Sequence, residues 1–210
     1  MHKSLQAVIE KRIERTVKAL CANHYDAHYL SGIPQLHEKL AEYVSAGSTC
    51  TVGGSMTLFE TGVIDYLKGC GCTYYDRYAE SADINDIYRK AFSCDVYFAS
   101  ANAVTEDGYL FNVDGRGNRV AAMVYGPQKV VVVAGYNKIV KDLDAARARI
   151  REIAAPANCV RLNLGNPCAK TGYCMDCKSD TYICGNELVL KLQTQKDRIT
   201  VLILPDSYGF

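Results

Sequence analysis

Four cysteines near the C-terminal end of the sequence have the types and spacing that most strongly indicate chemistry. They are Cys168, Cys174, Cys177 and Cys184, spaced C-x5-C-x2-C-x6-C within 17 residues. Four thiolates in one loop can close around a tetrahedral metal ion or an iron–sulfur cluster. Only Cys174 and Cys177 form the short pair usual in structural zinc sites, so an iron–sulfur cluster of the 4Fe–4S type is favoured over zinc. A loop without metal is the remaining alternative.

The other six cysteines are scattered among apolar residues. They are Cys21, Cys50, Cys70, Cys72, Cys94 and Cys159. A free cysteine in such surroundings usually behaves as a small buried hydrophobic residue. The sequence opens without the apolar core of an export signal, so we expect a cytoplasmic, reducing compartment. There, clustered cysteines favour metal or redox chemistry over disulfides.

A glycine-rich turn forms a second candidate site. The sequence Gly-Gly-Ser-Met-Thr-Leu-Phe-Glu at residues 53–60 follows a strand pattern and opens a helix. The first amides of a helix are unpaired and lie at its positive end, so Gly53, Gly54, Ser55 and Thr57 are predicted to bind an anionic group. Glu60, one turn further on, is a candidate catalytic base. The alternative is a tight strand-to-helix turn without a ligand, since the motif is neither a Walker loop nor a GxGxxG fingerprint.

Polar residues also gather after the strand predicted at residues 95–100. Open α/β sheets bind ligands at this carboxyl edge. Asp and Asn are common turn residues too, so a purely structural role is the alternative for each of them. Asp107 is the second candidate base. The candidate substrate-binding residues are Asn102, Asn112, Asp114, Asn118, Arg119, Asn137 and Lys138.

Hydrophobic periodicity predicts the elements that position these residues. Helices are expected at residues 4–22, 34–44, 56–67, 84–92 and 142–153, the last ended by Pro156, and strands at 25–29, 48–52, 72–75, 95–100, 109–113, 129–134 and 199–204. Strands that alternate with helices predict an α/β fold with a mainly parallel sheet and helices on both faces. We expect one domain over residues 1–210, with an irregular Cys-rich insert at residues 165–187.

Composition and charge narrow the classes of partner. Lys and Arg number 24 against 23 Asp and Glu, a formal charge of +1, so no basic field indicates nucleic acid. No apolar run approaches the ~18 residues of a membrane helix. The expected partners are therefore a small anionic substrate and a redox partner protein, and assembly as a homo-oligomer stays open.

Several ordered segments resemble the LUD domain, the lactate-utilisation family. They are residues 53–62, 102–108, 112–119 and 133–138, with Asn-Pro-Cys at 166–168 and Tyr-Gly-Phe at 208–210. The resemblance spans nearly the whole chain. It implies a fold like those of ribose-5-phosphate isomerase, glucosamine-6-phosphate deaminase and CoA-transferases, in which the turn at residues 53–57 binds phosphate or another anion. It also implies a part in a multi-protein L-lactate oxidation system with iron–sulfur carriers. The best-known small lactate-utilisation subunits lack the four-Cys motif, which favours a separate, cluster-bearing branch.

Three functions are compatible with these features. The first is an iron–sulfur redox enzyme or electron-transfer subunit that acts on a hydroxy acid such as lactate or on a phosphorylated compound. The second is a non-redox isomerase- or transferase-like enzyme, in which Glu60 or Asp107 acts as the base and the Cys loop holds zinc. The third is a non-catalytic sensor or partner subunit.

Overall fold

Six parallel strands form the central sheet in a computed structural model that describes residues 2–210. The strand order is β1-β10-β7-β4-β2-β3, and every neighbouring pair is parallel. The strands are β1 (Asp26–Tyr29), β2 (Thr49–Val52), β3 (Thr73–Tyr74), β4 (Val96–Ala99), β7 (Lys129–Gly135) and β10 (Ile199–Leu204). The C-terminal ends of β2, β4 and β7 therefore lie at one edge of the sheet.

Strands β7 and β10, which are neighbours in the interior of the sheet, are mostly apolar on both faces. Val130 to Val133 of β7 and all six residues of β10 are buried. This continuous run of apolar side chains is typical of a parallel strand covered on both sides.

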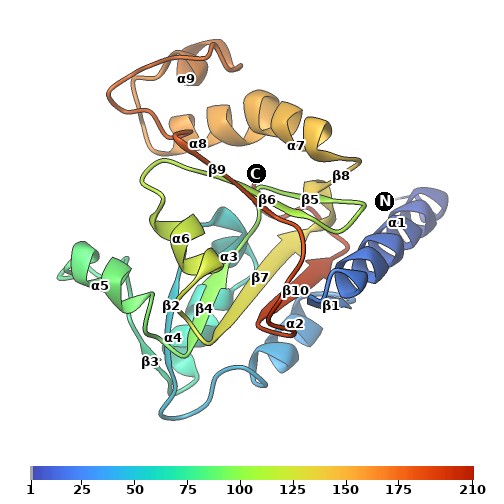
Figure 1. Ribbon diagram of the computed structural model, residues 1–210, viewed down its shortest axis with the longest axis vertical. Helices are drawn as coiled ribbons and strands as arrows, with labels where there is room; N and C mark the ends of the chain where they lie inside the picture. Colours follow the sequence, from blue (N-terminus) through green and yellow to red (C-terminus); the bar gives the residue numbers. More distant parts are fainter. Residues whose placement is uncertain (1) are drawn as a thin grey trace.

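Helices cover both faces of the sheet, as predicted, so the fold is α/β (Figure 1). Helix α1 (Lys3–Ala22) and helix α6 (Asn118–Val124) pack on one face through residues such as Ile13, Leu20 and Met123. The opposite face is covered by α2 (Ile33–Leu40), α3 (Met56–Glu60) and α4 (Val63–Gly69). The predicted helix at 56–67 is divided because Gly62 adopts φ 70°, in the left-handed region. Helix α5 (Ile84–Lys90) follows β3.

A second, smaller sheet was not predicted from the sequence. Its order is β8-β5-β6-β9, formed by β5 (Ala103–Thr105), β6 (Leu110–Asp114), β8 (Ile139–Val140) and β9 (Asn186–Leu190). Ala103 and Phe111 face the helical run above this sheet, whereas Val104 and Leu110 belong to the core of the central sheet. The small sheet therefore links the helical run to the body of the protein.

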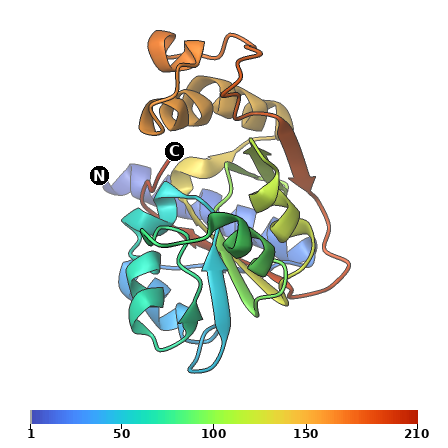
Figure 2. The ribbon, with the colours of Figure 1, turned by 90° about the vertical axis from the view of Figure 1, so that its left-hand side faces the viewer.

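The helical run continues beyond Pro156, contrary to the prediction that it ends there. It consists of α7 (Leu143–Arg149), a π-helical turn (Ile150–Ala154) and α8 (Ala155–Arg161). The wider π turn lets the chain continue past a proline that cannot donate its amide. Helix α9 (Pro167–Thr171) begins the Cys-rich segment, which lies on the far side of α7 and α8 from the central sheet in both views (Figures 1 and 2).

No helix within residues 2–210 is long and apolar enough to cross a membrane.

Candidate functional site

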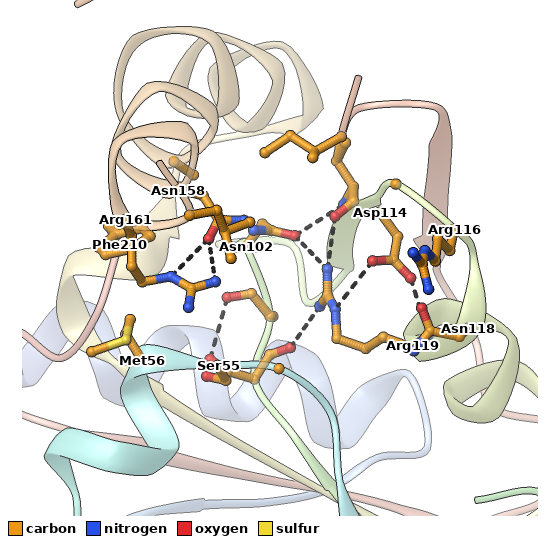
Figure 3. Close-up of a pocket in the computed structure, with 18 of the residues that line it drawn as sticks. Ser55, Met56, Asn102, Asp114, Arg116, Asn118, Arg119, Asn158, Arg161 and Phe210 are labelled. Atoms are coloured by element: carbon orange, nitrogen blue, oxygen red, sulfur yellow. Dashed lines mark hydrogen bonds and ion pairs between the residues drawn. The ribbon is translucent and has the colours of Figure 1, made fainter. Parts of the chain in front are cut away.

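A cavity of about 250 Å³ opens at the carboxyl edge of the central sheet, beneath α8. We call it the cationic cavity. Figure 3 shows Asn158 and Arg161 on one side, Asp114, Arg116, Asn118 and Arg119 on the other, and Ser55 and Met56 below. Its further lining residues include Gly54, Arg77, Ser100, Asn102, Lys138, Ile183 and Phe210.

Positive side chains dominate this cavity. Five cationic side chains line it, and Asp114 is the one carboxylate among its lining residues. The cations are Arg77, Arg116, Arg119, Lys138 and Arg161. Cations that converge in a concave site attract an anionic ligand, and guanidinium groups suit carboxylate or phosphate oxygens.

Arg119 is the centre of a hydrogen-bond network that builds one wall. Its side chain is buried, and it donates from Nη1 to Ser100 O (3.1 Å) and Asn112 Oδ1 (2.6 Å). Its Nη2 donates to Asn102 Oδ1 (2.9 Å) and Val113 O (2.7 Å). The structure thus brings these three predicted residues together. Arg119 and Asn102 line the cavity, and Asn112 binds Arg119 without being among the lining residues.

Asp114 and Asn118 complete that wall at the start of α6. The Oδ2 atom of Asp114 accepts from the amide of Arg119 (3.0 Å), which fixes the first turn of the helix. Both residues line the cavity, as does the exposed Arg116 between them.

The glycine-rich turn contributes the floor, but its residues take different roles. Gly54 and Ser55 line the cavity, whereas Gly53 and Thr57 are buried. A Cβ atom at Gly53 would lie 2.9 Å from Tyr97 Oη and 3.0 Å from the Arg119 side chain. Because α3 has only five residues, its dipole is small, and the guanidinium groups dominate the positive potential.

Lys138 lies in the cavity wall close to the last residues of the chain. It is 3% exposed, and its Nζ donates to the main-chain oxygen of Phe210 (3.1 Å). Burial lowers the pKa of Lys138 to about 7, and the nearby Arg149 and Arg119 add to this effect. A lysine amine with such a pKa can hold or release a proton near neutral pH.

The chain end is fixed in this position by three further side chains. Thr57 donates to Tyr208 O (3.0 Å), and Asn137 accepts from the amide of Tyr208 (3.2 Å) and donates to Gly209 O (3.0 Å). Glu60 accepts from the amide of Gly209 (2.7 Å). Glu60, Thr57 and Asn137 therefore hold Phe210 at the cavity without being among its lining residues.

Asp107 lies elsewhere. It belongs to the turn between β5 and β6, where its main-chain oxygen accepts from Asn23 Nδ2 at the end of α1 (2.9 Å). Its side chain is exposed and is not among the lining residues of the cationic cavity.

Three of the cavity arginines, Arg77, Arg116 and Arg161, were not among the candidate residues of the sequence analysis. Arg77 follows the edge strand β3, and its guanidinium packs over the rings of Tyr78 and Tyr88. Its Nε atom is buried without a hydrogen-bond partner in residues 2–210. Arg161 ends α8 and donates to Asn158 Oδ1 (3.0 and 2.6 Å). The pairing of Arg with two neighbouring aromatic residues is a signal that could have indicated Arg77.

A second cavity of about 190 Å³, the thiol cavity, lies within the Cys-rich segment. All four predicted cysteines line it, together with Cys159 of α8, which was expected to be an ordinary core residue. Cys159 and Cys168 are buried, and Cys174, Cys177 and Cys184 are partly exposed. Asn166 donates to the sulfur of Cys159 (3.2 Å) and to Thr181 O (3.1 Å), which holds the loop against the helix.

The thiol cavity has a donor set suited to a soft metal centre. Burial raises the pKa of Cys168 and of Cys184 to about 11, so both are neutral thiols at pH 7. Arg151 pairs with Asp176 at the cavity rim, and the two opposite charges balance each other there. No group of three or more His, Cys, Asp or Glu side chains in residues 2–210 is arranged to hold a metal ion. The thiols therefore surround a common space rather than converge on one point.

The two cavities share a wall. Val113 and Ile183 line both of them. Ile183 precedes Cys184 in the sequence, and Val113 is the residue whose carbonyl accepts from Arg119. The cationic cavity and the thiol cavity are therefore neighbours, with Val113 and Ile183 bordering both.

Comparisons with known proteins found one matching family model and several similar solved structures. The family model described as the LUD domain matches residues 13–204. A solved DUF162 family protein from Deinococcus radiodurans is similar in fold, with a TM-score of 0.52 and 12% identity over 95% of this chain and 98% of that chain. The delta subunit of eIF2B from Chaetomium thermophilum matches with a TM-score of 0.37 and 17% identity, over 53% of this chain and 49% of that chain. No curated protein is similar enough in sequence to count as a match.

Proposed function

Because the chain belongs to the LUD domain family, we propose that it binds a small anionic substrate in the cationic cavity beside an iron–sulfur cluster held in the thiol cavity. In this proposal the protein is a redox enzyme or electron-transfer subunit. The substrate is a hydroxy acid such as lactate, or a small phosphorylated compound.

The observation that carries the proposal is the wall of Val113 and Ile183 common to both cavities. A binding site that only recognised an anion would have no need of five cysteines on the other side of that wall. A structural metal site, in turn, would have no need to adjoin a cavity lined by five cations. The two features together support a site in which substrate and electron acceptor are neighbours.

Charge and size support the class of substrate. A volume of about 250 Å³ lies below the ~300–1,000 Å³ typical of sites for drug-sized ligands. We assign the anionic group of the substrate to Arg77 and Arg161, with Ser55 between them as a neutral donor. Arg119 is less available, since its Nη1 and Nη2 atoms already donate four hydrogen bonds.

We assign proton transfer with the substrate to the amine of Lys138. Its lowered pKa lets it accept a proton from a substrate hydroxyl or return one within the cationic cavity. Glu60 and Asn137 position the chain end that contacts Lys138, and so act on it indirectly.

In the thiol cavity, Cys168, Cys174, Cys177 and Cys184 would hold the cluster, with Cys159 as a buried fifth thiol nearby. When bound, such a cluster supplies one-electron transfer. The side chains around it, including Phe111, Ile150 and Ile183, exclude water and so tune its potential.

Anaerobic purification with iron, sulfide and zinc analysis tests the cluster. We expect iron and sulfide in stoichiometric amounts and a visible absorption band that dithionite bleaches. A colourless protein without iron after reconstitution would contradict the proposal, and stoichiometric zinc would favour the non-redox alternative.

Substrate binding is tested separately, by calorimetry with lactate, with inorganic phosphate and with a neutral sugar. We expect the anions to bind and the sugar not to bind. The variant Arg161→Gln should weaken anion binding without changing the iron content, so the two halves of the proposal can fail independently.

A further inference from the structure

Three cysteines outside both cavities lie in contact with one another. The Sγ atom of Cys72 is 3.2 Å from that of Cys50 and 3.3 Å from that of Cys70. We call these residues the thiol trio. The sequence analysis treated them as separate core residues, because Cys50 lies 20 residues or more before the other two.

Pairing of neighbouring strands brings the trio together. Cys50 is buried in β2, opposite Tyr74 of the edge strand β3. Cys70 caps α4, and Gly71, with φ 80°, turns the chain so that Cys72 reaches back toward Cys50. Cys70 and Cys72 are partly exposed, so a small reagent can reach the trio from outside.

The trio differs from an ordinary buried cysteine. Cys94 is also buried, in the bend that precedes β4, but its sulfur forms hydrogen bonds with main-chain oxygens, those of Ala91 and Val96. Burial of a cysteine in this core therefore does not by itself place its sulfur against another sulfur. Burial raises the pKa of Cys50 and of Cys72, and the neighbouring Cys70 adds to this effect, so these two residues are held as neutral thiols. An uncharged disulfide fits this apolar position better than a thiolate does.

We propose that the thiol trio is a reversible disulfide site in which Cys72 is the shared partner of Cys50 and Cys70. The oxidant is a low-molecular-weight disulfide such as glutathione disulfide. The thiolate of Cys72 attacks one sulfur of the oxidant, forms a mixed disulfide and releases one thiol. Cys50 then attacks the Cys72 sulfur as its thiolate, and the proton that it gives up is taken by the second small thiolate as that group leaves.

The balance of this exchange is two cysteine thiols and one disulfide on one side, and one protein disulfide and two small thiols on the other. Cys70 can attack the Cys72 sulfur in turn, which frees Cys50 and moves the bond to the partly exposed pair. That second bond is the one an external thiol reaches when it reduces the site.

Trypsin separates the two bonds cleanly. Cleavage after Lys39, Lys68 and Arg77 places Cys50 in peptide 40–68 and both Cys70 and Cys72 in peptide 69–77. A Cys50–Cys72 bond joins the two peptides, whereas a Cys70–Cys72 bond leaves peptide 69–77 alone and lighter by two hydrogen atoms. The full chain, as isolated, is incubated with glutathione disulfide, quenched with acid, alkylated, digested and mapped by mass spectrometry.

We expect the joined peptides in the wild type and their loss after reduction with excess glutathione. Cys70→Ser should keep the joined peptides, and Cys50→Ser should give the internal bond in peptide 69–77. Cys72→Ser should give neither, and Cys94→Ser, the matched buried control, should behave like the wild type. Joined peptides that persist in Cys72→Ser, or a wild type whose trio stays reduced while other cysteines are glutathionylated, would overturn the proposal.

Discussion

Arg119 donates a hydrogen bond of 2.6 Å from Nη1 to the Oδ1 atom of Asn112, within the wall of the cationic cavity. The Nδ2 atom of the same asparagine is buried without a partner in residues 2–210. The guanidinium of Arg119 approaches the carboxylate of Asp114 only to 4.0 Å, from Nε to Oδ1. The guanidinium charge is thus oriented by amide and carbonyl oxygens rather than cancelled by an acid, which leaves it effective toward an anion.

Replacing Arg119 by Met should destabilise the protein by ~3 kcal/mol, because the change leaves several buried oxygens without a donor. Urea unfolding followed by circular dichroism measures this. Arg116→Met, at an exposed position of the same cavity, should change stability by less than ~0.5 kcal/mol. Equal midpoints for the two variants would contradict a structural role for Arg119.

Gly54→Val should abolish anion binding with little loss of stability. A Cβ atom at Gly54 points toward Arg77, 3.5 Å from its Nη1, so a larger side chain would occupy the space where the ligand meets the guanidinium. Gly53→Ala is the contrasting variant, because its Cβ would collide with Tyr97 and Arg119 and lower stability. Calorimetry with sulfate, alongside thermal unfolding, separates the two effects. Wild-type affinity in Gly54→Val would refute the assignment.

Arg77→Gln should weaken inorganic phosphate binding about 10- to 100-fold, the loss expected for one charge-assisted hydrogen bond of about 1.5–3 kcal/mol. Arg147→Gln is the control, since Arg147 pairs with Glu187 at the surface and does not line the cationic cavity. Both dissociation constants are measured at the same ionic strength. An identical effect of both changes would indicate nonspecific attraction.

Anion affinity should fall as pH rises through about 7, where buried Lys138 loses its proton. Sulfate is the appropriate probe because its own charge is constant over this range, and Lys138→Met should bind sulfate weakly at every pH. The pKa of lysine is ~10.4 when unfolded, so the unfolded chain binds more protons between pH 7 and 10 and the contribution of Lys138 to stability rises over that window. A pH-independent affinity in the wild type would show that Lys138 does not face the ligand.

Metal loading should protect the Cys-rich segment from proteases. In the metal-bound protein, Cys174→Ser or a chelator should increase tryptic cleavage near Lys170 and Lys178 while the α/β body stays folded, because thiolate ligation orders a loop with little apolar burial. Cys21→Ser, an exposed position outside both cavities, is the control. Cleavage rates that are equal with and without metal would contradict a shared site for the four cysteines.

The central sheet could be predicted from the sequence because its signals are local. Four consecutive valines indicate a buried strand at β7, and the glycine-rich turn marks the carboxyl end of β2. The small sheet could not be predicted in the same way. Strand β8 has two residues and exists through its pairing with β5, and β9 begins with Asn186 and Glu187, which are exposed.

Residues of the candidate site could be predicted only where they lie on or shortly after a strand that the sequence itself indicates. The sequence predicts that the helix ends at Pro156. Cys159 and Arg161 lie beyond that proline, on α8, which continues the helix through the π turn, and so they were not assigned to a site. Arg77 and the thiol trio depend on the pairing of β2 with β3, which is a relationship between distant segments and leaves no local pattern.

The place of β10 between β1 and β7 has a consequence for how the chain is made. Asp26 near the start pairs with Thr200 near the end, and β10 is the only sheet neighbour of β1 in the part of the chain that the structure describes. During synthesis, β1 therefore has no strand to pair with until residue 204 has left the ribosome. Such non-local closure slows folding, and until β10 is in place one edge of β7 stays unpaired, which favours aggregation of the incomplete sheet.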